Sequence, residues 1–260
     1  MTDFGLSSYI VNRSNIEHLR HMQPEYLDRL SDPLQQFIHD VEKGAGVEIK
    51  VILHPKQNGG GTTGQGKLEV VIKAQSIQIL APTNGYFPEG AVRHEVLHAR
   101  RIHVEGVPML VLADTVVWDQ GFSDALIAID NAIEHVIIVP EELQFHPERH
   151  EHWEAVMRDV CLGLPSVPEH ERHLAVCLHW TFLQHVLPNS PSVEIARDFA
   201  KSNALLEMAH DFADRFISIA ASKEQLVELL FHNFQEILPK NRAALEYISS
   251  TKRIYQKPIP

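Results

Sequence analysis

Strand-like patterns are concentrated in the first half of this 260-residue chain, and this uneven distribution limits the folds open to it. From about residue 147 onward, apolar residues recur at helical spacing almost throughout. Strands grouped in one half favour an α+β fold over a doubly wound sheet, in which strands and helices alternate. The strand-like runs, rich in β-branched or alternating apolar residues, are 47–53, 68–73, 76–80 and 107–113.

Helical spacing fills most of the remaining chain. Gly44-Ala45-Gly46 is expected to end the first helix, and Pro140 is expected to end the third. The predicted helices are 24–43, 88–104, 124–138, 149–163, 169–186, 191–220, 222–237 and 240–250. We therefore expect two domains, a core with the small sheet over 1–140 and an all-helical half over 141–260, to which the sequence assigns no role.

The charge balance is acidic, with 34 acidic and 23 basic side chains and a formal net charge of −11. Broad nucleic-acid binding depends on Lys and Arg side chains that neutralise phosphates. We therefore expect no nucleic-acid partner.

The two cysteines, Cys161 and Cys177, lie in apolar helical patterns and form no CxxC motif. This pattern predicts two buried thiols in a reducing compartment rather than a disulfide. The sequence around Met1–Leu6 lacks the basic and apolar regions of a signal peptide, and no apolar run reaches the roughly 18 residues of a membrane span. We expect a cytoplasmic protein with no membrane partner.

A glycine-rich segment at 58–67 is predicted to be a flexible loop. Its second part, Gly61 to Lys67, resembles the start of a phosphate-binding P-loop. However, Leu68 stands where that motif needs Ser or Thr, and the segment leads into a strand-like run instead of a helix. The pattern therefore favours a hairpin loop over a nucleotide site.

The predicted helix at 88–104 contains the motif His94-Glu95-Val96-Leu97-His98. Histidines four residues apart lie on one helix face, where both imidazoles can bind one Zn²⁺. Glu95 can then act as general base toward a water that zinc activates, and next as proton donor to the leaving group. The alternative is an exposed helix with two surface histidines. The apolar residues at the other helix positions argue against it.

A third ligand is expected, because catalytic zinc usually has three protein ligands and an open position. The apolar helix at 124–138 carries one polar stripe, whose members are three or four residues apart. Burying such a stripe without partners is costly, and a metal ion facing it removes that cost. The alternative is a thin exposed face. The stripe consists of Asp130, Asn131, Glu134 and His135.

Within this stripe, Glu134 is the preferred ligand and His135 is the rival. Asp130 and Asn131 then suit a supporting role in which they orient the ligands. His103 is a further candidate, but its spacing from His94 does not match the three-histidine metzincin pattern.

The motif together with Glu134 resembles the zincin metallopeptidases, and among them the gluzincins, which pair an HExxH helix with a glutamate on a following helix. The apolar run that ends at Pro140 is loosely similar to the ImmA/IrrE-like peptidases. The resemblance covers about residues 47–140. It implies a zincin-like metallohydrolase core over 1–140, a zinc cofactor and a peptide or protein substrate.

The sequence thus predicts a zinc-dependent metallopeptidase, a hydrolase in which His94, His98 and Glu134 hold the metal and Glu95 is the catalytic base. Two alternatives stay open. One is a zincin-like protein without catalytic activity that binds a partner. The other is a metal-dependent hydrolase of a non-peptide amide, since the same site chemistry serves both substrates.

Overall fold

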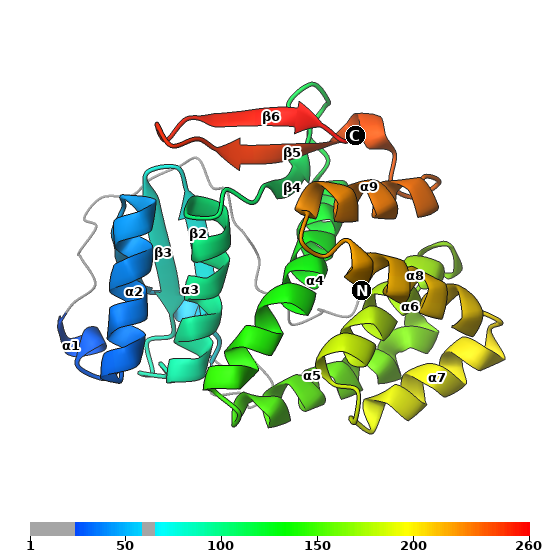
Figure 1. Ribbon diagram of the computed structural model, residues 1–260, viewed down its shortest axis with the longest axis horizontal. Helices are drawn as coiled ribbons and strands as arrows, with labels where there is room; N and C mark the ends of the chain where they lie inside the picture. The colour runs from blue at the N-terminus through cyan, green and yellow to red at the C-terminus, as the bar shows by residue number, and fades with distance from the viewer. Residues whose placement is uncertain (1–23, 59–65) are drawn as a thin grey trace. The chain divides into compact units, whose positions relative to one another are not determined.

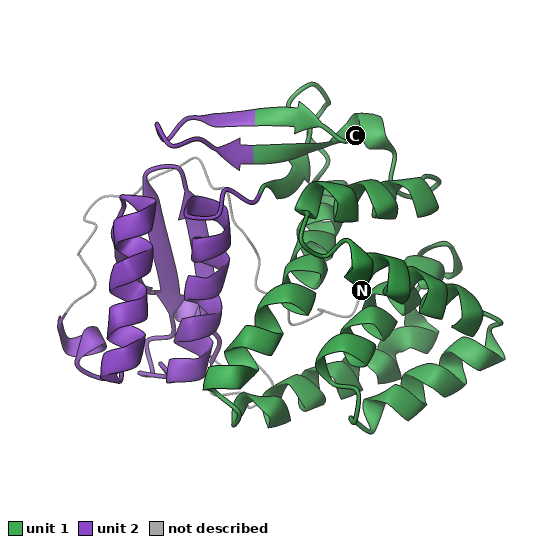
Figure 2. Ribbon diagram, in the orientation of Figure 1, with its two compact units in different colours: residues 1–6, 108–246, 256–260 green, residues 7–107, 247–255 purple. Residues whose placement is uncertain are grey.

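The structure is a computed structural model, and it describes residues 24–58 and 66–260. It confirms the predicted α+β fold. The chain forms two compact units, shown in separate colours in Figure 2. The N-terminal unit consists of the described residues up to Val107 together with Tyr247–Tyr255, and the C-terminal unit consists of Pro108–Glu246 and Gln256–Pro260. The chain thus passes between units at Val107, whereas the sequence suggested a division near residue 140.

A three-stranded sheet is the centre of the N-terminal unit, in the order β1-β3-β2 (Figure 1). β1 runs parallel to β3, and β2 runs antiparallel to it. Helices α2 and α3 pack against each other, and α3 contacts β2 and β3. The elements of this unit are α1 (Pro24–Leu27), α2 (Asp32–Ala45), β1 (Ile49–Leu53), the 3-10 turn η1 (Pro55–Gln57), β2 (Glu69–Lys73), β3 (Ser76–Ala81) and α3 (Glu89–His103).

The three strands predicted for this unit are confirmed, and so is the helix predicted at 88–104. The strand β2 directly follows the glycine-rich segment, as expected for a hairpin loop rather than a P-loop. Residues 59–65 of that segment lie outside the described part of the chain. The sheet core is apolar because Ile49, Ile77 and Ile79 are completely buried.

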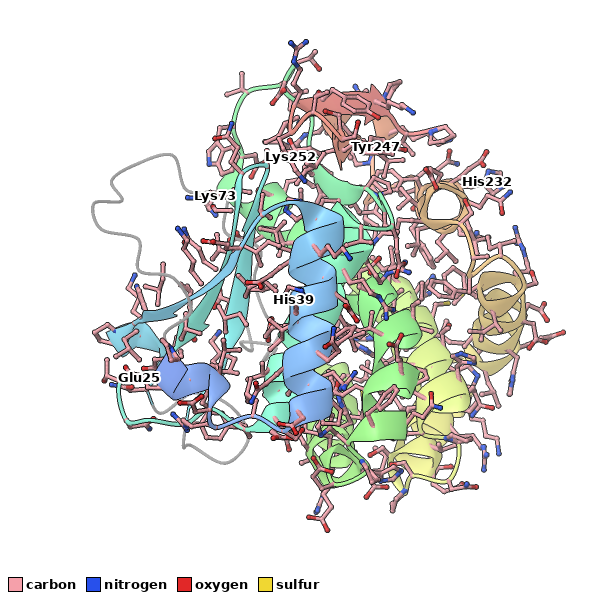
Figure 3. All side chains as sticks on the ribbon, turned by 60° about the vertical axis from the view of Figure 1, so that its left-hand side comes forward. Glu25, His39, Lys73, His232, Tyr247 and Lys252 are labelled. Carbon is pink, nitrogen blue, oxygen red and sulfur yellow. The ribbon has the colours of Figure 1, made fainter. Side chains whose placement is uncertain are left out.

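The first predicted helix is interrupted, which corrects the continuous helix expected over 24–43. Pro33 lies in the first turn of α2, and Ser31 before this turn has an extended backbone. Proline is favourable in a first helical turn but unfavourable in a helix interior, where it removes a backbone hydrogen bond, so a new helix begins here. The helix ends as predicted, because Gly46 adopts the left-handed conformation with φ 64°. His39 on α2 is exposed, as Figure 3 shows.

The C-terminal unit combines helices with β4 and most of β5 and β6, which form a second three-stranded sheet in the order β4-β5-β6. Helix α6 contacts α4, α5, α7 and α8, and its side chain Trp180 is only 1% exposed. The elements are β4 (Met109–Leu112), α4 (Gln120–Phe145), α5 (Arg149–Gly163), the 3-10 turn η2 (Leu164–Ser166), α6 (Glu169–Val186), α7 (Ser192–Ser202), α8 (Leu206–Ser218), α9 (Lys223–Asn233), the 3-10 turn η3 (Lys240–Arg242), β5 (Ala243–Ile248) and β6 (Ile254–Pro258).

The expected end of a helix before Pro140 is wrong, because α4 continues to Phe145 with Pro140 inside it. A proline inside a helix removes one backbone hydrogen bond and costs about 3 kcal/mol. The extra turns bury Glu142 and Val139, each 0% exposed. Packing within the unit therefore outweighs the local preference of the proline.

Two further predictions of continuous helix are wrong. The segment expected to be a helix at 240–250 contains the strand β5, which pairs antiparallel with β4, so the second half is not all-helical. The segment 191–220 is two helices, because the chain turns at Ala204, which has φ 57°. The first difference arises because a short apolar pattern fits a strand as well as a helix, and the second because no glycine or proline marks the turn at Ala204. In the described residues, no helix is long and apolar enough to cross a membrane.

Candidate metal centre

The HExxH motif lies in the middle of α3 and is buried. His94, Glu95 and His98 are 4%, 3% and 1% exposed. The intervening Val96 and Leu97 are fully buried as well. The alternative of two surface histidines on an exposed helix is therefore wrong.

The imidazoles of His94 and His98 face each other, with their Nε2 atoms 3.2 Å apart. Their rings are perpendicular, and the ring centroids are 4.8 Å apart. Two nitrogen ligands at about 2.0–2.1 Å from a tetrahedral Zn²⁺ are about 3.3–3.4 Å from each other. The spacing of the two Nε2 atoms therefore fits two neighbouring ligands of one tetrahedral metal ion.

The carboxylate of Glu95 contacts the strand beside the helix. Its Oε2 atom accepts a hydrogen bond from the backbone N–H of Val70 in β2, at 2.9 Å. Val70 is 2% exposed, so this bond is shielded from water. It orients the side chain of Glu95 and joins the motif to the sheet.

The polar stripe of α4 is buried, so the alternative of a thin exposed face is wrong. Asp130, Asn131, Glu134 and His135 are 2%, 0%, 2% and 4% exposed. Buried polar groups require partners, and the carboxylates and the histidine of the stripe meet different parts of the unit.

The two carboxylates of the stripe bind a buried lysine at the start of α9. Lys223 Nζ lies 2.8 Å from Asp130 Oδ1 and 2.7 Å from Glu134 Oε1. Asp130 Oδ1 also accepts from the backbone N–H of Leu110 in β4, at 3.1 Å. Burial by itself lowers the pKa of Lys223, but the two carboxylates outweigh it and raise this pKa above its usual value. The cluster therefore contains a charged lysine and joins α4, α9 and β4.

His135, the next residue after Glu134, packs against helix α5. Its ring lies edge to face with the indole of Trp153, with centroids 5.1 Å apart. Trp153 Nε1–H in turn donates to Glu142 Oε2 at 3.1 Å, and Arg149 Nε donates to the other oxygen at 2.6 Å. His135 is thus next to an ordered chain of side chains.

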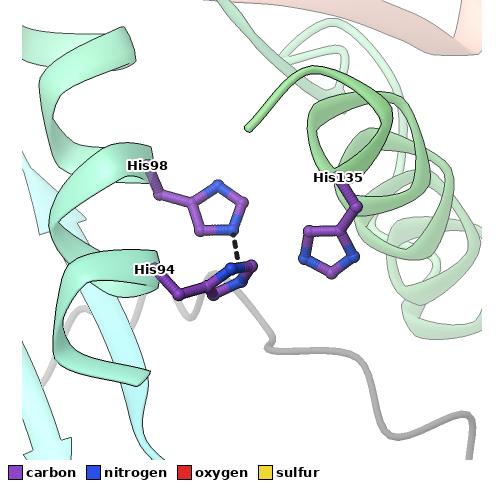
Figure 4. A group of neighbouring side chains, drawn as sticks. All are labelled: His94, His98 and His135. Atoms are coloured by element: carbon purple, nitrogen blue, oxygen red, sulfur yellow. Dashed lines mark hydrogen bonds between the residues drawn. The ribbon is translucent and has the colours of Figure 1, made fainter. Parts of the chain in front are cut away.

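Three histidines form a group that could bind a metal ion: His94, His98 and His135. All three are buried, and their ligand atoms lie within 4.8 Å of one another (Figure 4). Among the described residues, it is the one group of three or more His, Cys, Asp or Glu side chains whose ligand atoms lie this close together. Imidazole nitrogen is a good ligand for zinc, copper, iron and nickel, so the donor set itself does not identify the metal.

Of the predicted ligands, the two motif histidines and His135, the rival third ligand, belong to the group that could bind a metal ion. The structure places Glu134, the preferred third ligand, on Lys223. It also places Asp130 in the lysine cluster, and Asn131 is buried on the same helix face. His103 lies elsewhere in the N-terminal unit, where its Nε2 is 3.0 Å from the carbonyl oxygen of Lys73.

Four residues around these side chains were not found by sequence reasoning. Val70 contributes through its backbone, which no side-chain motif records. Lys223, Glu142 and Trp153 lie far from the motif in the sequence, and each stands at an ordinary helix position. No sequence signal marks them.

The prediction of two buried thiols is confirmed. Cys161 and Cys177 are free and buried, and burial raises the pKa of each thiol to about 12. They belong to the core of the C-terminal unit.

In comparisons with known proteins, no family, no curated protein and no solved structure matches this chain.

Proposed function

We propose that this protein is a zinc-dependent peptidase in which His94, His98 and His135 hold the metal and Glu95 is the general base. The observation that carries the proposal is the buried group of three imidazoles, two of which have tetrahedral ligand spacing. The HExxH order adds the carboxylate next to the first histidine, where metal-dependent hydrolysis needs a base.

His135 replaces Glu134 as the proposed third ligand because the two side chains have different partners. The carboxylate of Glu134 is bonded to a buried, charged lysine, and its departure would leave Lys223 with one counter-charge fewer. The imidazole of His135 belongs to the group of three histidines. Neutral imidazoles leave the full charge of the metal available, which strengthens its effect on a bound water or carbonyl.

When bound, zinc supplies Lewis-acid chemistry: it polarises a carbonyl group and lowers the pKa of a coordinated water toward about 7. The protein's own residues do the rest. Glu95 accepts the proton of the attacking water and passes it to the leaving amine. The hydrogen bond from the backbone N–H of Val70 holds the carboxylate of Glu95 in place. The base therefore loses less conformational entropy when it reaches the reactive geometry.

The metal site is tested by zinc analysis of purified protein and by competition with a chromophoric chelator. We expect one zinc per chain in the wild type and a large loss of affinity in His94→Ala, His98→Ala and His135→Ala. Glu134→Gln is the matched control, because it changes the neighbouring polar residue but keeps all three imidazoles. If Glu134→Gln lost zinc and His135→Ala retained it, the assignment of the third ligand would be wrong.

The reaction is tested with a mixture of fluorogenic peptides. Wild-type protein with zinc should cleave at least one sequence, and Glu95→Gln should retain zinc but lose cleavage by about 100-fold or more, since general-base catalysis typically contributes about 100- to 10,000-fold. Cleavage that survives in Glu95→Gln would contradict the mechanism. Zinc binding without cleavage of peptides would favour a binding protein or a hydrolase of a non-peptide amide.

A further inference from the structure

We infer that Trp153 and Glu142 are positioning residues that hold the imidazole of His135 in the orientation needed for metal binding. The inference rests on the proposed function, and it assigns roles to two residues outside the HExxH motif and the third ligand. All the contacts that carry it lie within the C-terminal unit.

The first observation is the packing of the ring of His135. Trp153, on α5, lies against it with a centroid distance of 5.1 Å and an interplanar angle of 65°. Both side chains are buried, at 4% and 5% exposure. An edge-to-face contact of this kind is favourable and depends on direction, so it restricts the rotation of the imidazole about its side-chain bonds.

The second observation is that Trp153 is itself held by polar contacts. Glu142 is 0% exposed and uses one oxygen for the indole N–H and the other for the guanidinium of Arg149. Glu142 and His135 are seven residues apart on α4, about two helical turns, so they lie on the same face of the helix. Trp153 on α5 contacts both of them.

These contacts form one connected chain from Arg149 through Glu142 and Trp153 to His135. A carboxylate with both oxygens bonded has little freedom to move, so the indole has one favoured position. The indole then forms a fixed wall beside the imidazole. Residues that orient a metal ligand through hydrogen bonds typically change metal affinity by about 10–100-fold when they are removed, and we take this range for the aromatic wall as well.

The test compares Trp153→Leu with Trp153→Phe and Trp180→Leu. Trp180 is a matched control, because it is also buried and also packs edge to face against a histidine, His210, at 4.8 Å. Zinc affinity is measured with the metal ion alone in chelator competition, and the melting temperature is measured in excess EDTA. The Co²⁺ form supplies an absorption spectrum that reports on the geometry of the ligands.

We expect Trp153→Leu to weaken zinc binding by about 10–100-fold and to change the Co²⁺ spectrum. Trp153→Phe, which keeps an aromatic wall, should recover most of the affinity. Trp180→Leu should lower the melting temperature of the metal-free protein to a similar extent but leave the zinc affinity within about twofold of the wild type. Glu142→Gln weakens the hydrogen bond that positions the indole, so its zinc affinity should lie between those of Trp153→Phe and Trp153→Leu.

Wild-type affinity in Trp153→Leu, or an equal loss of affinity in Trp180→Leu, would overturn the inference. The proposed function would survive that result, because the wild type would still bind zinc through its three histidines. If the wild type bound no zinc, or if His135→Ala bound it as tightly as the wild type, the proposed metal site would itself fail.

Intrinsic fluorescence gives an independent readout, because open-shell Co²⁺ quenches an indole that lies close to it. In Trp180→Phe, which retains Trp153 and the exposed Trp118, Co²⁺ should quench a large part of the emission. In Trp153→Phe most of this quenching should be lost. Equal quenching in the two variants would contradict the placement of Trp153 beside the metal ligand.

Discussion

Glu95 Oε2 and the backbone N–H of Val70 form a 2.9 Å hydrogen bond between the HExxH helix and β2. Both residues are buried in the N-terminal unit. Glu95, the proposed catalytic base, therefore also accepts a hydrogen bond that joins α3 to β2. Different substitutions at this position can separate the catalytic role from the structural one.

We expect Glu95→Ala to lower the free energy of unfolding by about 1–3 kcal/mol, because it leaves the N–H of Val70 buried without an acceptor. Glu95→Gln keeps an amide oxygen at this place and should cost less than about 1 kcal/mol. Urea denaturation in EDTA measures both values without a contribution from metal binding. Equal stability of the two variants would show that the bond contributes little.

Lys223 should be among the most sensitive positions of the C-terminal unit. Lys223→Met leaves the carboxylates of Asp130 and Glu134 buried together without their cation. Breaking a buried ion pair in this way costs about 3–5 kcal/mol. Thermal and chemical denaturation of the variant should show this loss.

A control combines Lys223→Met with substitutions that remove the charges of Asp130 and Glu134. In Lys223→Met with Asp130→Asn and Glu134→Gln, no buried charge of the cluster is left unpaired, so part of the lost stability should return. A triple variant that is less stable than Lys223→Met would indicate that packing of the lysine, and not its charge, matters.

His103 should make the folded state less stable in mild acid. Burial, and then the positive charge of Lys252, lowers the pKa of His103 from 6.5 to about 4, although the bond to the carbonyl of Lys73 acts in the opposite direction. Because the folded pKa lies below the unfolded pKa, the unfolded chain binds the proton first as the pH falls. The stability that this group contributes is complete above about pH 6.5 and is lost between there and about pH 4.

The loss from His103 should be about 1–2 kcal/mol, since partial exposure of the ring weakens the effect. His103→Gln removes the titrating group, so the difference in unfolding free energy between wild type and variant should change over this pH range. Urea denaturation at several pH values between 4 and 7 measures this difference. A difference that stays constant with pH would contradict the lowered pKa.

The two thiols should be unreactive in the folded protein. Cys161 and Cys177 are 1% and 0% exposed, and with pKa values of about 12 they contain almost no thiolate at neutral pH. A thiol reagent such as dithionitrobenzoate should label both only after unfolding in guanidinium. Fast labelling of either residue under native conditions would contradict the burial of that thiol.

Much of the fold follows from local sequence patterns. The three strands between residues 49 and 81, the HExxH helix, and helices α5 and α6 were predicted within a few residues. These elements have clear apolar periodicity and defined ends, such as Gly46 after α2. Errors arose where tertiary contacts outweighed local preference. Pro140 remains inside α4, and the apolar segment at 243–248 pairs with β4 instead of forming a helix.

For the candidate site too, local sequence patterns predicted some features, and others depended on tertiary contacts. The order of residues was enough to place His94 and His98 on one helix face with Glu95 beside them, because helical spacing fixes these relations within one turn. It also identified the polar stripe of α4 and both of its candidate ligands. Folding, and not the local pattern, separates the two candidate ligands: Glu134 binds Lys223, whereas His135 packs against Trp153 and belongs to the group of three histidines that could bind a metal ion. Neighbouring residues on a helix point in directions about 100° apart, and the partners they meet come from distant parts of the chain.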